Sequence, residues 1–166
     1  RPLLNQSRLQ CVQASIIVIN FTDEIDWKRN LPASSHQNHY ATHFTYNFIN
    51  GGSDAGVSYF ESWEIVKRCG TPTVFDYGGL ASGGASRWMT GYEKYYNAMH
   101  NRISDVYTIS AGDETGLNVL KNWIYNHLGE SPEGGIASFY IGWRDVKTLA
   151  AGTPEAGKHI VTDFYA

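Results

Sequence analysis

The sequence has little of what marks several protein classes. It contains two cysteines in 166 residues, which is too few for a disulfide framework. Lys and Arg number 13 against 16 Asp and Glu, and no basic stripe is present. Nucleic acid and anionic membranes are therefore not expected partners. No apolar run approaches the roughly 18 residues of a membrane span, so we expect none.

The chain is long enough for a substantial core, and its first residue is not methionine. A chain of 166 residues can bury roughly two thirds of its unfolded surface, which suits one domain or slightly more. It begins with Arg1 rather than methionine. We therefore expect a processed or truncated part of a longer protein.

A polar loop near the start of the chain leads directly into a dense apolar segment. Cys11 stands at this junction, and apolar residues follow at Val12, Ala14, Ile16, Ile17, Val18, Ile19, Phe21 and Ile25. Such crowding on several faces predicts a helix that is buried on most sides and runs from Cys11 to about Arg29. Ile16, Ile17 and Phe21 should belong to the core.

The predicted position of Cys11 is one where a thiol can be reactive. Unpaired N–H groups and the positive end of the helix dipole stabilise a thiolate in the first turn of a helix. The thiolate is the nucleophilic form of cysteine. The alternative is a small, inert, buried thiol, which is the commoner fate of a single cysteine.

Three histidines follow the first helix. The spacing of His36, His39 and His43 could place two imidazoles on one helical face, as in zinc sites. The same segment offers no carboxylate or thiolate to complete a ligand set, and surface histidines are the alternative. We predict no metal site and no cofactor.

Turn and capping signals divide the rest of the chain. Phe44–Ile49 ends at Asn50-Gly51-Gly52, and a helix is predicted from Ser58 until Gly70 and Pro72 end it. Alternating residues predict strands at 105–110, 135–141 and 159–164. Between the first two, Asp113 should cap a helix that ends at Gly129.

Two stretches resemble papain-like cysteine peptidases of a bacterial type. Asn5-Gln6, a polar loop, Cys11, Ala14 and a long apolar helix are similar to the family pattern Gln-Gly-x-x-Gly-x-Cys-Trp-Ala-Phe-Ala. The later order of a glycine pair, a helix, Cys-Gly-Thr-Pro-Thr and Tyr77 also resembles the family.

The resemblance implies roles for particular residues. Cys11 would be the nucleophile, and Gln6 would donate a hydrogen bond to the oxyanion of the tetrahedral intermediate. Gly51 and Gly52 would form backbone hydrogen bonds with an extended substrate, although a plain turn explains such glycines equally well. The catalytic histidine and asparagine would lie beyond Ala166, with His159 as the other candidate for the base.

The resemblance also implies a fold and an activity. It predicts an α+β papain-like fold, in which residues 1–103 form the helical half and residues 104–166 begin a β-rich half that is incomplete. The implied activity is that of a thiol protease that hydrolyses peptide bonds of a peptide or protein substrate through a thioester. The implied compartment is extracellular or periplasmic, and the oligomeric state stays open.

A non-catalytic module is the competing hypothesis. Val12 stands where the family has tryptophan, and the loop before Cys11 has no glycine. A module of this kind would bind peptides or other partners without cleaving them, and its thiol would be incidental. The retained pair of Gln6 and Cys11 favours the enzyme.

Overall fold

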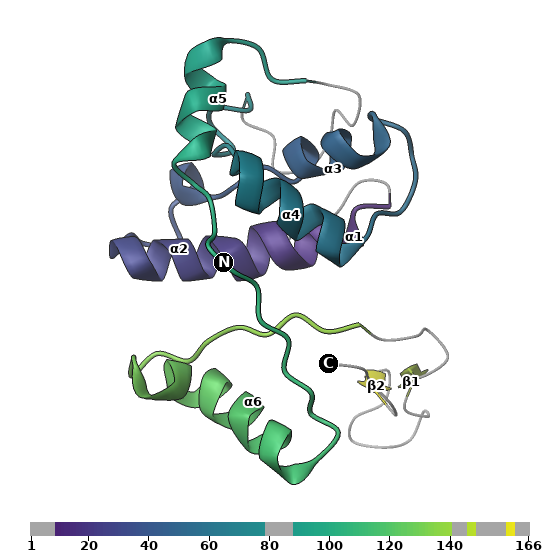
Figure 1. Ribbon diagram of the computed structural model, residues 1–166, viewed down its shortest axis with the longest axis vertical. Coiled ribbons are helices and arrows are strands. Elements are labelled where there is room, and N and C mark those ends of the chain that lie inside the picture. Colours follow the sequence, from purple (N-terminus) through teal and green to yellow (C-terminus); the bar gives the residue numbers. More distant parts are fainter. Residues whose placement is uncertain (1–8, 79–87, 141–145, 149–158, 162–166) are drawn as a thin grey trace. The chain divides into compact units, whose positions relative to one another are not determined.

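A computed structural model of the protein describes residues 9–78, 88–140, 146–148 and 159–161 (Figure 1). The chain divides into two compact units, Arg1–Tyr107 and Thr108–Ala166. The first unit is built from helices, whereas the described part of the second holds a long helix, a short 3-10 turn and two short strands.

Cys11 begins a continuous helix that ends at Arg29. Its successive parts are α1 (Cys11–Gln13), the π-helical stretch η1 (Ala14–Phe21) and α2 (Thr22–Arg29). Ile16, Ile17 and Phe21 are all buried, with exposed fractions of 0%, 0% and 3%. The predicted helix and its core residues are therefore confirmed.

The π-helical stretch was not predicted, but local chemistry accounts for it. Four consecutive β-branched residues, Ile16–Ile19, crowd the turns of an α-helix and lower its propensity. The backbone N–H of Thr22 donates to the carbonyl of Ile17, five residues earlier, which is the register of a π-helix, and the Thr22 hydroxyl donates to the same carbonyl at 2.8 Å. Stretches of this type are rare and often occur near functional sites.

Two further helices pack against the beginning of this long helix. They are α3 (Thr42–Asn50) and α4 (Tyr59–Cys69), and both contact α1 as well as each other (Figure 1). Burial of apolar side chains stabilises this arrangement by about 25 cal/mol per Å². The buried cluster consists of Val12, Ile16, Ile17, Phe21, Tyr40 and Val66.

The first unit has a second, smaller cluster beside the first. The turn η2 (His36–Asn38) precedes α3, and α5 (Tyr92–Met99) packs on α4. The second cluster consists of Ala41, Phe44, Tyr77 and Met89, with Cys69 and Tyr95 packed against it. Cys69 is thus half-buried in packing at the last residue of α4.

Arg29 connects the end of α2 to the region after α5. Its guanidinium donates hydrogen bonds to Tyr40 Oη at 3.3 Å, to Asn101 Oδ1 at 2.9 Å and to the carbonyl of His100 at 2.8 Å. Burial raises the pKa of Tyr40, an effect that Arg29 opposes and Asp26 reinforces. Arg29 therefore holds three chain segments together and offsets part of the cost of burying that phenol.

Replacing Arg29 by methionine should lower the free energy of unfolding by about 1–2 kcal/mol, because three hydrogen bonds to a charged group are lost. Urea denaturation followed by circular dichroism would measure the change. Arg68→Met is the matched control. Its guanidinium forms only an exposed 3.3 Å pair with Glu64, worth no more than about 0.5 kcal/mol. Equal losses in the two variants would contradict this account.

The second unit begins with the helix that the sequence predicted. In α6 (Glu114–Asn126), Asp113 caps the first turn by accepting a 2.8 Å hydrogen bond from the backbone N–H of Gly116. The short 3-10 turn η3 (His127–Gly129) follows. His127 and Leu128 both have positive φ angles, of 49° and 57°, which residues other than glycine rarely adopt.

The predicted α+β class, with a β-rich half beginning near residue 104, is wrong. Residues 105–110 and 135–139 form no strand. The strands that the structure describes are β1 (Val146–Thr148) and β2 (His159–Val161), which pair antiparallel with Thr148 opposite His159. The predicted strand at 159–164 is thus present for three residues, and its remainder lies outside the described residues. Two such short strands do not begin a β-rich half.

The segment around Gly134–Ile136 shows why an alternating pattern failed to become a strand. The N–H of Gly135 donates to the carbonyl of Trp123 at 2.9 Å, and Trp123 Nε1 donates to the carbonyl of Ile136 at 3.0 Å. A Cβ on Gly134 would lie 1.7 Å from the carbonyl oxygen of Ile124. The two glycines therefore let this segment run against α6, and strand propensity yields to that packing.

No helix among the described residues combines the length and the apolar character that crossing a bilayer requires. The prediction that these helices include no membrane span agrees with this finding.

Candidate functional site

The thiol of Cys11 is exposed at the first residue of the long helix. The residue before it, Gln10, has φ and ψ of −101° and 24°, and its carbonyl accepts a 2.9 Å hydrogen bond from the N–H of Ala14. Val12 and Gln13 are buried immediately after it. The sequence folds this way because a polar loop gives way to apolar residues at Cys11, so the thiol remains accessible while the helix behind it enters the core.

A buried pair of polar side chains lies next to Cys11. Gln10 Nε2 and His43 Nε2 are 2.6 Å apart, and both residues have an exposed fraction of 0%. The other ring nitrogen of His43 lies 3.2 Å from the hydroxyl of Thr42. The ring is also stacked near Tyr77 and edge-on to Tyr46, each at 6.3 Å between centroids.

The sequence does not reveal this pair, because the spacing of His36, His39 and His43 suggests either metal ligands or surface residues. In the structure, His39 Nε2 lies 3.0 Å from the carbonyl of Ala33, whereas His43 is enclosed in the core. The parts of the chain that the structure describes contain no group of three or more His, Cys, Asp or Glu side chains placed to hold a metal.

A second buried glutamine lies one turn along the helix. Gln13 Nε2 donates a 2.9 Å hydrogen bond to the hydroxyl of Ser62 in α4, and both residues have an exposed fraction of 0%. Two buried amides, Gln10 and Gln13, thus attach the start of the long helix to α3 and α4. Each has a side-chain oxygen for which the described residues provide no hydrogen-bond partner.

The predicted substrate-binding glycines form the turn that ends α3. Gly51 is left-handed with φ of 65°, and the N–H of Gly52 donates to Asn50 Oδ1 at 2.9 Å. Shortly after them, Asp54 Oδ1 accepts a 3.2 Å hydrogen bond from the N–H of Leu9. The structure therefore brings the turn with the glycine pair to the loop that precedes Cys11.

Two further residues were predicted for the site, Gln6 and His159. Gln6 lies outside the described residues, and His159 is the first residue of β2 in the second unit. Within the described part of the first unit, the Cys11 thiol makes no hydrogen bond. The described site therefore has a nucleophile and backbone N–H donors, and it lacks a paired imidazole.

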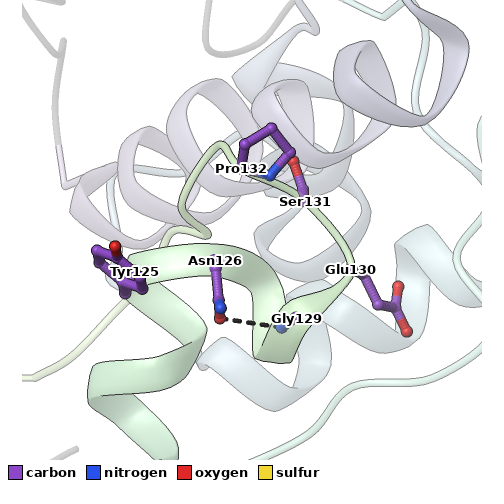
Figure 2. A pocket seen from close by; sticks show the side chains of 6 residues that line it. All are labelled: Tyr125, Asn126, Gly129, Glu130, Ser131 and Pro132. Atoms are coloured by element: carbon purple, nitrogen blue, oxygen red, sulfur yellow. Dashed lines mark hydrogen bonds between the residues drawn. The ribbon is translucent and has the colours of Figure 1, made fainter.

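The second unit has a shallow pocket at the end of α6 (Figure 2). It is lined by Tyr125, Asn126, Gly129, Glu130, Ser131 and Pro132. Inside it, the N–H of Gly129 donates to Asn126 Oδ1 at 2.9 Å. The lining combines a turn with one carboxylate and offers no nucleophile paired with a base, so Cys11 remains the candidate reactive group.

No protein-family model matches the chain, and no match was found among curated proteins or solved structures.

Proposed function

We propose that the chain carries the nucleophile of a cysteine-type peptidase that hydrolyses peptide bonds through a thioester. The observation that carries this proposal is the exposed thiol of Cys11 at the first residue of a helix whose following turns are buried. The long helix places first-turn N–H groups and a positive dipole end beside the sulfur. An exposed thiolate in such surroundings is a competent nucleophile.

The proposed reaction has two displacement steps. The thiolate adds to the peptide carbonyl, and the N–H of Cys11 stabilises the oxyanion, with Gln6 as a second donor on the basis of the resemblance. The C–N bond then breaks, the amine leaves with a proton, and a thioester remains on Cys11. Water attacks the thioester, releases the carboxylic acid and restores the thiol.

The proton for the leaving amine must come from an imidazole other than His43. In the pair with Gln10, the Nε2 atom of His43 is already engaged at 2.6 Å. The proposal assigns this role to His159 or to a histidine beyond Ala166. If the histidine lies beyond Ala166, the 166 residues by themselves should accept an acyl group from a good leaving group and should not cleave peptide amides.

Acetylation by p-nitrophenyl acetate tests this proposal directly, because nitrophenolate leaves without a proton. At pH 7 we expect one acetyl group on Cys11, detected by intact-protein and peptide mass spectrometry. The rate should be about three- to fivefold above that of N-acetylcysteine, from stabilisation of the thiolate by the helix start. The Cys11→Ser variant controls for acetylation elsewhere. A rate equal to that of N-acetylcysteine would count against an activated thiol and would favour a non-catalytic module.

A further inference from the structure

We propose that His43 is a positioning residue for Cys11, which acts by fixing the side chain of Gln10. This inference rests on the proposed function, since it concerns how the same nucleophile is held. His43 lies 33 positions from Gln10 in the sequence and belongs to another helix, α3.

Breaking the contact between these two side chains would destabilise the folded protein. Their nitrogens are 2.6 Å apart and both residues have an exposed fraction of 0%. Separating them would leave an amide and an imidazole in the core without this hydrogen bond, which costs about 1–3 kcal/mol for each group. The side chain of Gln10 is therefore held firmly to α3.

His43 is itself well anchored. Its Nδ1 atom lies 3.2 Å from the hydroxyl of Thr42, and its ring is stacked near Tyr77 and edge-on to Tyr46. Tyr77 is in turn held by a 3.1 Å hydrogen bond from Asn47 Nδ2, also in α3. The position of the Gln10 side chain therefore depends on the position of α3.

Gln10 is the residue whose backbone determines where the helix and its thiol begin. Its carbonyl accepts the first hydrogen bond of the helix, from the N–H of Ala14, and Cys11 follows it directly. The N–H of Leu9 is bound to Asp54 Oδ1. The loop is consequently fastened at two successive residues, and the bond between Gln10 and His43 is the fastening nearest to the thiol.

The hydrogen-bonding capacity of His43 supports positioning rather than proton transfer. In one orientation of the Gln10 amide, Nε2 of His43 accepts from the amide nitrogen. In the other, it donates to the amide oxygen. In both cases Gln10 occupies the Nε2 atom, so this atom cannot take the proton of Cys11.

Two amide variants of His43 separate positioning from general damage. The glutamine amide reaches about as far as Nε2 of histidine and can still bond to Gln10. The shorter asparagine amide reaches only about as far as Nδ1. Both variants remove the imidazole ring, and they differ in whether the contact with Gln10 survives.

The experiment measures alkylation of Cys11 and Cys69 by iodoacetamide at pH 7, using peptide mass spectrometry on the folded protein. We expect His43→Asn to slow Cys11 about fivefold, because a frayed first turn stabilises its thiolate less. His43→Gln should retain a rate within about twofold of the original. Cys69 packs against the cluster that includes Tyr77, which stacks near the His43 ring, so loss of the imidazole should change the Cys69 rate to the same extent in both variants.

Gln13→Leu provides the matched control. Gln13 is an equally buried glutamine in the first turn, where it bonds to Ser62 and not to His43, so its loss tests general loosening of the turn and should slow Cys11 less than about twofold. Equal slowing in the two His43 variants, or in Gln13→Leu, would overturn the proposal. If His43→Asn unfolds and both cysteines accelerate, Gln10→Asn removes the same contact from the other side and must slow Cys11 alone. Alkylation requires no hydrolysis, so this result is independent of whether the protein is a peptidase.

Discussion

Replacing Cys11 by alanine should lower kcat/KM for peptide hydrolysis by at least about a thousandfold, because no thioester can form without the sulfur. Cleavage of a fluorogenic peptide library would measure the loss. The folded state should be little affected, since the side chain of Cys11 is exposed and makes no hydrogen bond with the described residues. Loss of hydrolysis with an unchanged melting temperature would show that Cys11 takes part in the reaction.

Cys69→Ala is the matched control for this experiment. Cys69 is half-buried at the last residue of α4, packed against the cluster that includes Phe44 and Tyr77. Truncation of this packed side chain removes apolar contacts and leaves a small cavity. We expect Cys69→Ala to change stability more than rate. Full peptide hydrolysis in the Cys11→Ala protein would refute the assignment and would favour a non-catalytic module.

Gly70→Ala should lower the free energy of unfolding by at least about 3 kcal/mol. Gly70 follows α4 with φ of 71° and ψ of −164°, a conformation essentially restricted to glycine. A Cβ at this position would lie 1.8 Å from the carbonyl oxygen of Ala98, which is backbone and cannot move aside. Urea denaturation would measure the loss.

Gly51→Ala distinguishes the clash from the backbone conformation. Gly51 also has a positive φ, of 65°, but no atom lies within 4 Å of a Cβ built there. Its replacement should cost only about 1 kcal/mol, the usual penalty for a left-handed residue other than glycine. If the two variants lost similar stability, the close approach between Gly70 and the backbone of Ala98 would not be a feature of the folded protein.

Local signals in the sequence were sufficient for several helices. The apolar run after Cys11 predicted the long helix to Arg29, because most of its faces are apolar and a helix is the compact way to bury them. Gly70 and Asp113 were identified as the end of one helix and the cap of another, and both predictions are confirmed. These features depend on residues within a few positions of each other, so the sequence alone is enough to predict them.

Strand predictions failed where they needed a distant partner. Residues 105–110 alternate as a half-buried strand would, yet Tyr107 has an exposed fraction of 85% and the segment forms no strand. An alternating pattern states only that a segment could pair, because strand formation depends on a neighbouring strand. Around Gly135, the backbone bonds to the carbonyl and the indole N–H of Trp123 and not to a neighbouring strand.

For the candidate site, the sequence by itself determined that Cys11 would stand where a polar loop meets a buried helix. Only the tertiary structure decided that Gln10 and His43 lie 2.6 Å apart and that Asp54 holds Leu9. From the sequence, His43 was grouped with His36 and His39 because of their spacing, as metal ligands or surface histidines. It is buried because α3 packs against α1, and a contact between residues 33 positions apart leaves no periodic signal in the chain.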